Sequence, residues 1–215
     1  MKNFVVIGLG RFGSAVATEL CRLGHQVLAV DTDGDLVQLL ADEVTHAVTA
    51  DARNAEVLEG LGIQDYDCAI VAVGNDVGTS ALITLQLKEL GVPRIICKAQ
   101  SHVHLRLLEK LGADRVIFPE FESAVNLAQG LANSNILNFI ELSPDYGLVE
   151  VDMPLSWAGK TIRELDVRVK YQVNIISVRR GQDISVAPGA DWVLAAGDRL
   201  FVVGRDENIA RLCAQ

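Results

Sequence analysis

The sequence predicts a doubly wound parallel α/β domain followed by a smaller α+β domain, and three observations lead to this prediction. In the first half of the chain, short blocks of Val, Ile and Ala alternate with helical patterns. Blocks that are apolar at every position are typical of strands that helices cover on both faces. A glycine-rich turn directly follows the first block, and from residue 137 onward the blocks become short and β-branched.

Six strands separated by five helices are expected in the first domain. The strands are expected at residues 4–7, 26–30, 46–49, 68–73, 94–98 and 115–118, and the helices between them at 13–23, 35–41, 55–61, 76–90 and 102–111. Ser101 stands where it can cap the helix after it, and Gly24, Gly91 and Gly112 stand where left-handed helix ends are expected. Six strands with crossovers complete a Rossmann-type sheet, which we assign to residues 1–121.

The pattern changes in the second half. Residues 122–138 are expected to hold a crossover helix, over 122–133, and a linker with the domain boundary at Ser134-Asn135. The strands after it are expected at 139–142, 148–151, 174–179, 184–187 and 199–203, and short helices at 161–165 and 206–213. Such a mixture is typical of an α+β domain, which we assign to residues 139–215.

The composition excludes several classes of protein. A net charge of −9 over 215 residues, without clustered Lys and Arg, argues against a nucleic-acid partner. No apolar stretch approaches the roughly 18–20 residues that cross a bilayer, and the N-terminus lacks the regions of a signal peptide. The four cysteines are far apart and show no zinc-binding spacing. We therefore expect a soluble, intracellular protein.

A G-x-G-x-x-G motif lies between the first strand and the first helix. Its residues are Gly8, Leu9, Gly10, Arg11, Phe12 and Gly13. The three glycines permit a tight turn, close approach of the backbone to phosphate, and close packing of helix on strand. The helix N-terminus adds unpaired N–H groups and a partial positive charge. The motif therefore predicts a site for the phosphates of a nucleotide.

The second strand ends in Asp31, 18 residues after Gly13, where an acid accepts hydrogen bonds from ribose hydroxyls. A 2′-phosphate beside Asp31 and Asp33 would be repelled, so NADP is disfavoured against NAD, ATP or ADP. Thr32 lies between the two acids and is counted with the site. Asp33 has an alternative interpretation as a turn residue before Gly34.

Two further strand ends point at the same edge of the sheet, where open α/β sheets bind ligands. Asp51, with Ala52, follows the third strand and is placed to face an adenine. Gly74, Asn75 and Asp76 follow the fourth strand, where a glycine permits close approach of the backbone. For Asn75 and Asp76 the alternative is an N-cap of the next helix.

Three charged residues complete the candidate site. Arg11 sits in the phosphate-binding turn. Its side chain either reaches a phosphate that is bound to its own or to a neighbouring subunit, or it lies in solvent. Lys98 ends the fifth strand and is counted among the nucleotide-binding residues. Glu120 follows the sixth strand, and a carboxylate near a polyphosphate is repelled unless a divalent cation such as Mg²⁺ or Ca²⁺ lies between them. Glu120 is thus either a cation ligand or exposed to solvent.

Signals for catalysis are lacking. No histidine follows residue 104, and the four histidines are expected at helix ends or surface positions. The sequence contains no G-x-S-x-G motif, no P-loop lysine and no Cys/His pair. A nucleotide site without a proton donor indicates a sensor rather than an enzyme.

Several of these segments resemble the RCK (KTN) domains, which regulate the conductance of K⁺ channels and transporters. The N-terminal segments are residues 6–13, 30–31, 50–52 and 73–76. Residues 154–165 and 188–200 are similar to the RCK C-terminal (TrkA-C) domain. With one copy of each domain, the chain resembles the regulatory subunits of Ktr-type potassium uptake systems.

The resemblance implies a cytoplasmic subunit on the inner face of the membrane, assembled as a dimer-based octameric ring under a membrane K⁺ channel subunit (KtrB-like). It implies ATP or ADP, and often NAD(H), in the Rossmann site. Arg11 matches a family arginine that reaches the γ-phosphate across a dimer. Glu120 matches a glutamate that helps to hold a divalent cation with ATP.

The second domain of many family members binds cyclic di-AMP at its dimer interface. The residues here that are similar to that site are Arg168, Asn174, Ile175, Ile176 and Pro188. Not every member responds to cyclic di-AMP. The alternative for the two isoleucines is a place in a core strand.

Three other functions compete with this interpretation. The nearest is an RCK-type regulator of another cation channel or antiporter. A small NAD-dependent oxidoreductase requires a proton donor that the sequence does not show. A redox-sensing transcriptional repressor requires a basic DNA-binding module, which the charge of −9 argues against.

Overall fold

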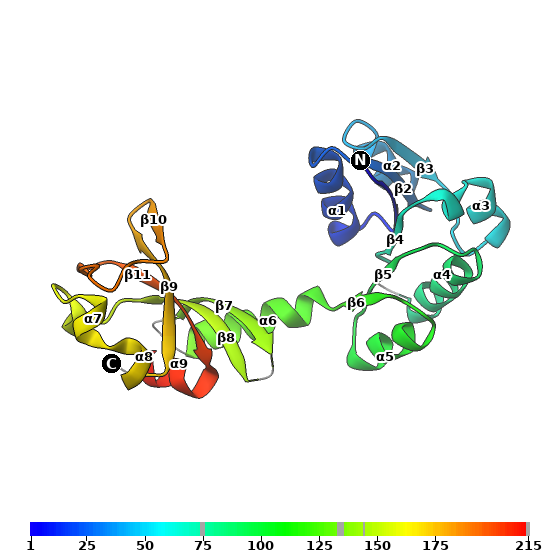
Figure 1. The fold of residues 1–215 in the computed structure, drawn as a ribbon. Helices are drawn as coiled ribbons and strands as arrows, with labels where there is room; N and C mark the ends of the chain where they lie inside the picture. Colours follow the sequence, from blue (N-terminus) through cyan, green and yellow to red (C-terminus); the bar gives the residue numbers. More distant parts are fainter. Residues whose placement is uncertain (74–75, 133–135, 144, 214–215) are drawn as a thin grey trace. The chain divides into compact units, whose positions relative to one another are not determined.

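The computed structural model describes residues 1–73, 76–132, 136–143 and 145–213, and the chain divides into two units, Met1–Glu120 and Phe121–Gln215 (Figure 1). None of the helices in the described residues is long and apolar enough to span a membrane. The Ser134-Asn135 boundary lies outside the described residues, and the assignment of residues 122–138 to a crossover helix and linker stays a prediction.

The first unit contains a six-stranded parallel sheet with the strand order β3-β2-β1-β4-β5-β6. The strands are β1 (Asn3–Ile7), β2 (Gln26–Asp31), β3 (His46–Thr49), β4 (Cys68–Val71), β5 (Ile95–Lys98) and β6 (Arg115–Ile117). The helices are α1 (Arg11–Arg22), α2 (Gly34–Leu40), α3 (Ala55–Gly60), α4 (Val77–Glu89) and α5 (His102–Lys110), with a 3₁₀ turn η1 (Ile63–Asp65). This order reverses between β1 and β4, which is the Rossmann arrangement, so the predicted fold class is confirmed.

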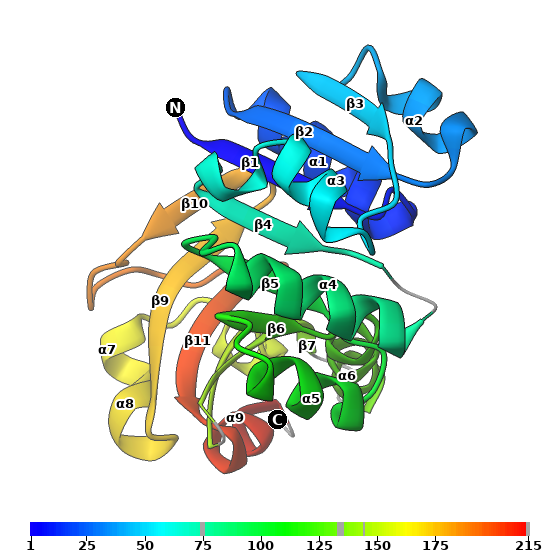
Figure 2. The same cartoon turned by 90° about the vertical axis from the view of Figure 1, so that its right-hand side faces the viewer.

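Helices cover both faces of this sheet. Val6 belongs to a core that includes residues of α1 and α2, whereas Val5 and Ile7 belong to a core that includes residues of α3, α4 and α5. Figure 2 looks onto the second of these faces, with α3, α4 and α5 in front of the strands. Because consecutive residues of β1 enter opposite cores, the strand is apolar at each position from Phe4 to Ile7, as the sequence pattern indicated.

The helix ends of this unit follow the predicted signals. The Ser101 hydroxyl accepts a hydrogen bond from the His104 N–H at 3.1 Å, so Ser101 caps α5. Gly24, Gly91 and Gly112 have φ angles of 82°, 77° and 97°. These are left-handed conformations that glycine adopts without strain, so the predicted helix ends are confirmed.

The second unit contains a five-stranded antiparallel sheet with the order β10-β9-β11-β8-β7. The strands are β7 (Ile136–Ser143), β8 (Tyr146–Asp152), β9 (Val173–Arg180), β10 (Asp183–Val186) and β11 (Arg199–Arg205). The helices are α6 (Pro119–Ala132), whose first two residues belong to the first unit, α7 (Ile162–Leu165), α8 (Val167–Lys170) and α9 (Asp206–Cys213), with a 3₁₀ turn η2 (Leu155–Trp157). One apolar core, which includes Trp157, Leu200 and Ile209, joins the sheet to η2, α7, α8 and α9. This is the predicted α+β domain.

Two helices differ from the sequence prediction by more than two residues at an end or in their existence. α6 begins at Pro119 rather than at residue 122, because proline fits the first helical turn, where no N–H has an intrahelical acceptor. α8 was not predicted. It is separated from α7 only by Asp166, whose φ angle of 46° turns the chain without a glycine, so the sequence carried no sign of the break.

Candidate nucleotide site

The glycine turn connects β1 to α1 in a conformation that only glycine fits at two positions. Gly8 has a φ of 95°, and a Cβ there would lie 2.9 Å from the backbone of Ala72 and Val73. A Cβ on Gly13 would lie 1.8 Å from the carbonyl oxygen of Gly8. Gly8 and Gly13 therefore shape the turn, and their sequence spacing follows from this contact between helix and strand.

Gly10 differs from the other two glycines because it faces open space. A Cβ on Gly10 would meet no atom within 4 Å. Gly10 is the N-cap residue of α1, and no side chain among the described residues caps this helix end. By contrast, Asp33, Asn54, Asp76 and Ser101 cap the helices α2 to α5. The N-terminus of α1 is thus open for an anionic group.

Asp31 lies at the end of β2, beside the glycine turn. Its Oδ2 accepts a hydrogen bond from the Leu9 N–H at 2.6 Å, and its Oδ1 accepts one from the Asp33 N–H at 2.9 Å. The Thr32 hydroxyl lies 3.5 Å from Oδ1. The carboxylate therefore joins the two loops that would surround a ribose, a structural role that the sequence did not indicate.

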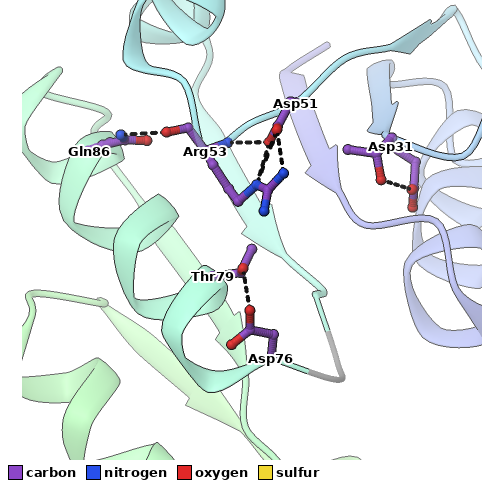
Figure 3. A network of polar contacts seen from close by, with 7 residues as sticks. Asp31, Asp51, Arg53, Asp76, Thr79 and Gln86 are labelled. Atoms are coloured by element: carbon purple, nitrogen blue, oxygen red, sulfur yellow. Dashed lines mark hydrogen bonds and ion pairs between the residues drawn. The ribbon is translucent and has the colours of Figure 1, made fainter.

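Asp51 follows β3 and makes an ion pair with Arg53 (Figure 3). The Arg53 Nη2 lies 2.7 Å from the Asp51 Oδ2, and the Arg53 Nε and backbone N lie 2.9 and 3.0 Å from Oδ1. These hydrogen bonds from Arg53 lower the pKa of Asp51 to about 2. Ala52 is buried. Asp51 therefore stays a carboxylate that can only accept hydrogen bonds.

Asp33 and Asp76 have their side chains engaged as helix caps. Asp33 accepts from the Asp35 N–H at 2.9 Å, and Asp76 accepts from the Gly78 N–H at 2.8 Å and the Thr79 hydroxyl at 2.7 Å. The alternative interpretations of these two residues, as a turn residue and an N-cap, agree with this geometry. Gly74 and Asn75 lie outside the described residues.

Lys98 and Glu120 form an ion pair at the ends of β5 and α6. The Lys98 Nζ lies 2.6 Å from the Glu120 Oε1, and it lies 5.9 Å from the centre of the Phe12 ring in the first turn of α1. The Lys98 side chain is only 14% exposed, whereas that of Glu120 is 62% exposed. The hydrogen bond from Lys98 lowers the pKa of Glu120, and the charge of Arg11 adds to this effect. Lys98, Glu120 and Arg11 thus gather near the open end of α1.

Glu120 is exposed to solvent, which was one of the two alternatives from the sequence, and it lies in the first turn of α6. Its ion pair with Lys98 was not indicated by the sequence. Within the described residues, no group of three or more His, Cys, Asp or Glu side chains could hold a metal ion.

In the second unit, two of the five predicted cyclic di-AMP residues are in contact. The Arg168 Nε donates a hydrogen bond to the Asn174 Oδ1 at 2.8 Å. Both isoleucines lie in β9, and Ile175 packs against the core of the unit, whereas Ile176 is 39% exposed. Pro188 is half-buried. The core interpretation therefore fits Ile175 but not Ile176.

One histidine was misplaced by the sequence interpretation. His104 is 1% exposed, and burial lowers its pKa. His104 lies four residues before Leu108, which is also buried, so the two side chains share the inner face of α5. The sequence reasoning also missed Arg53, for which no residue pattern gave a signal.

The sequence matches two domain families. Residues 4–119 match the TrkA-N domain and residues 148–215 match the TrkA-C domain. The chain is 42% identical over 210 residues to the Ktr system potassium uptake protein A of Bacillus subtilis, covering 98% of this chain and 95% of that protein. The Ktr system potassium uptake protein A of Vibrio alginolyticus is 37% identical, with 97% and 95% covered.

Solved structures of the GsuK channel have the same fold. The GsuK channel bound to NAD matches with a TM-score of 0.57 and 26% identity, covering 100% of this chain and 39% of that chain. GsuK bound to ADP matches with a TM-score of 0.55 and 27% identity, covering 62% and 34%. This chain thus spans well under half of the channel chain. The protein belongs to the family of TrkA-N and TrkA-C domain proteins that includes the Ktr system potassium uptake proteins A and C.

Proposed function

We propose that this protein is a cytoplasmic, nucleotide-sensing regulatory subunit of a K⁺ uptake system. One observation carries the proposal: the uncapped N-terminus of α1 opens behind a glycine turn, with the Asp31 carboxylate beside it. Helix N–H groups suit phosphates, and an acid at the end of β2 suits ribose hydroxyls. Relatives that cover nearly the whole chain are named for potassium uptake.

The ligand of this site is an adenine nucleotide, either ATP or ADP, with NAD(H) as the second candidate. GsuK structures are named for bound NAD and bound ADP, and both share the fold of this chain. Asp31 and Asp33 disfavour the 2′-phosphate of NADP by charge repulsion. We propose no catalytic residue for this protein.

The third phosphate of ATP acts on the ion pair between Lys98 and Glu120. Lys98 is nearly buried beside the glycine turn, so a phosphate at the end of α1 competes with Glu120 for its ammonium group. Glu120 is then free to turn toward a divalent cation that the phosphates hold. Only ATP would move Lys98 from Glu120 to a third phosphate. Because Glu120 belongs to the first turn of α6, the difference between ATP and ADP then acts on the helix that leaves the first unit. A difference in affinity between two conformations is what a ligand needs to shift a population.

Arg11→Ala is expected to weaken ATP binding about tenfold more than ADP binding, a difference of about 1.4 kcal/mol. The reason is that Arg11 is exposed and its positive charge acts on Glu120, near which the third phosphate would lie. Calorimetric titration of both nucleotides measures the ratio. Arg115→Ala is the control. Arg115 is also exposed, but it lies where β6 begins, whereas the candidate site lies where the parallel strands end. An unchanged ratio in Arg11→Ala would contradict this part of the proposal.

The assembly that we propose is a dimer-based octameric ring bound to a KtrB-like membrane K⁺ channel subunit. Leu127 and Leu131 of α6 are 64% and 76% exposed, and exposed apolar side chains of this size favour protein contacts. The second unit is proposed to bind cyclic di-AMP near Arg168 and Asn174.

Potassium uptake tests this function. The chain is co-expressed with a KtrB-like subunit in cells that lack other K⁺ uptake, and growth at limiting K⁺ is recorded for the wild type and for Gly10→Ala. We expect growth to depend on the wild-type chain and to fall with the variant. If growth does not depend on the chain while the purified protein binds ATP and ADP, the partner belongs to another channel or antiporter.

A further inference from the structure

Arg53 is fixed against Asp51 more firmly than its exposure suggests. Its guanidinium and its backbone N–H together donate to both oxygens of Asp51. The side-chain Nε2 of Gln86, from α4, donates to the Arg53 carbonyl at 3.0 Å. The charge of Asp76 also favours the Arg53 cation. Figure 3 shows that Arg53 lies between Asp51 and the start of α4, with Asp76 beyond Thr79.

The ion pair does not account for much stability. The side chains of Arg53 and Asp51 are 57% and 42% exposed, and ion pairs as exposed as this contribute little to the free energy of unfolding. Its larger consequence is the position of the Asp51 carboxylate, since four hydrogen bonds from Arg53 hold it in one orientation.

This carboxylate lies where the base of a bound nucleotide would be. Asp31 pairs with Thr49 in the β2–β3 register, and the Ala50 N–H donates to the Asp31 carbonyl at 2.8 Å. Asp51 is therefore two residues beyond the partner of Asp31. A ribose held by Asp31 places its base toward the end of β3 when its phosphates lie at α1.

We propose that Arg53 is a positioning residue for base selectivity, which fixes the Asp51 carboxylate as the acceptor for the 6-amino group of adenine. This inference rests on the proposed nucleotide site. A carboxylate has no hydrogen to donate, so it accepts from an amino group and repels the 6-oxo group of hypoxanthine or guanine. A site built around such a hydrogen bond rejects the analogue that lacks it, because a polar group is left unpaired.

The test compares ADP with inosine diphosphate, which differs in carrying a 6-oxo group in place of the 6-amino group. Calorimetric titration of the full chain is expected to show at least about a tenfold preference of the wild type for ADP, equivalent to about 1.4 kcal/mol. In Arg53→Ala the preference is expected to fall to about threefold or less, through weaker ADP binding. Asp51→Asn is expected to lose the preference as well, because an amide offers both a donor and an acceptor.

Arg22→Ala is the matched control. It removes a similarly exposed ion pair, with Glu19 on α1 at 2.6 Å, and the ADP preference is expected to persist. If Arg53→Ala binds ADP and keeps the wild-type preference, the role of Arg53 is overturned while the nucleotide site stands. If the wild type binds ADP and inosine diphosphate equally, the inference also fails. If the wild type binds neither, the inference and the proposed function fail together.

Discussion

Gly13→Ala is expected to destabilise the first unit by about 3 kcal/mol or more. The added Cβ would lie 1.8 Å from the Gly8 carbonyl oxygen, and this oxygen belongs to the backbone of a turn that is itself fixed. The Gly8 N–H donates to the Val30 carbonyl at 2.8 Å, so the turn cannot move without breaking its link to β2. α1 must therefore shift away from β1.

Hydrogen exchange of the amides in β1 and β2 measures this effect, because it reports on the first unit alone. Both tryptophans, Trp157 and Trp192, lie in the second unit, so the unfolding midpoint by tryptophan fluorescence serves as an internal reference. Exchange in β1 at the wild-type rate in Gly13→Ala would contradict the packing argument.

Gly10→Ala is the matched substitution in the same turn. Its Cβ meets no atom within 4 Å, and Gly10 has a φ of −65° that alanine adopts without strain. We expect a loss of less than about 1 kcal/mol in stability. Nucleotide affinity is expected to fall at least about tenfold, since the new methyl group occupies the space that a phosphate needs. The two variants thus separate folding from binding within one motif.

Asp198→Ala is expected to destabilise the second unit by about 2–3 kcal/mol. The Asp198 side chain is fully buried and accepts two hydrogen bonds from Arg180, each at 2.7 Å, and one from the Ala195 N–H at 2.9 Å. With alanine at position 198, the Ala195 N–H loses the carboxylate oxygen that accepts its hydrogen bond. Arg180 is half-exposed and can be hydrated, which keeps the expected loss below that of a fully buried pair.

The effect of Asp198 depends on pH. The hydrogen bonds from Arg180 hold the pKa of Asp198 below its ordinary value. A carboxyl group with a lowered pKa stabilises the folded state above its unfolded pKa of about 3.9, and this stabilisation is lost as the pH falls through the folded pKa. The difference between wild type and Asp198→Ala is therefore expected to be full at pH 7 and to shrink below about pH 4.

Urea unfolding followed by tryptophan fluorescence measures the difference, because both tryptophans report on the second unit. Asp191→Ala is the control: Asp191 pairs with Arg163 at 2.9 Å but is 83% exposed, so a loss of less than about 0.5 kcal/mol is expected. Equal losses in the two variants would show that burial of Asp198 does not matter.

Local patterns determined most of the fold. Strand β1 enters two cores, so its positions from Phe4 to Ile7 had to be apolar, and that run was visible in the sequence. A Cβ on Gly13 would clash, and the need for glycine at this position was likewise visible in the spacing of the three glycines. Helix ends could be predicted at Ser101 and Gly112 because capping involves residues a few positions apart.

Other features of the fold could not be predicted from residue types alone. The break at Asp166 depends on a left-handed conformation that no glycine announces. His104 is a polar residue on the inner face of α5, and its burial follows from the packing of that helix rather than from its residue type. A rule about terminal prolines would have placed the start of α6 correctly.

The sequence by itself determined the doubly wound sheet, the glycine turn and the position of Asp31, because each follows from residues that are near one another along the chain. Only the tertiary structure decided the partners of charged side chains that are far apart along the chain: Lys98 with Glu120, and Asp198 with Arg180. The physical reason is that an ion pair depends on which side chains meet within about 4 Å after folding, and on how far water is excluded from them.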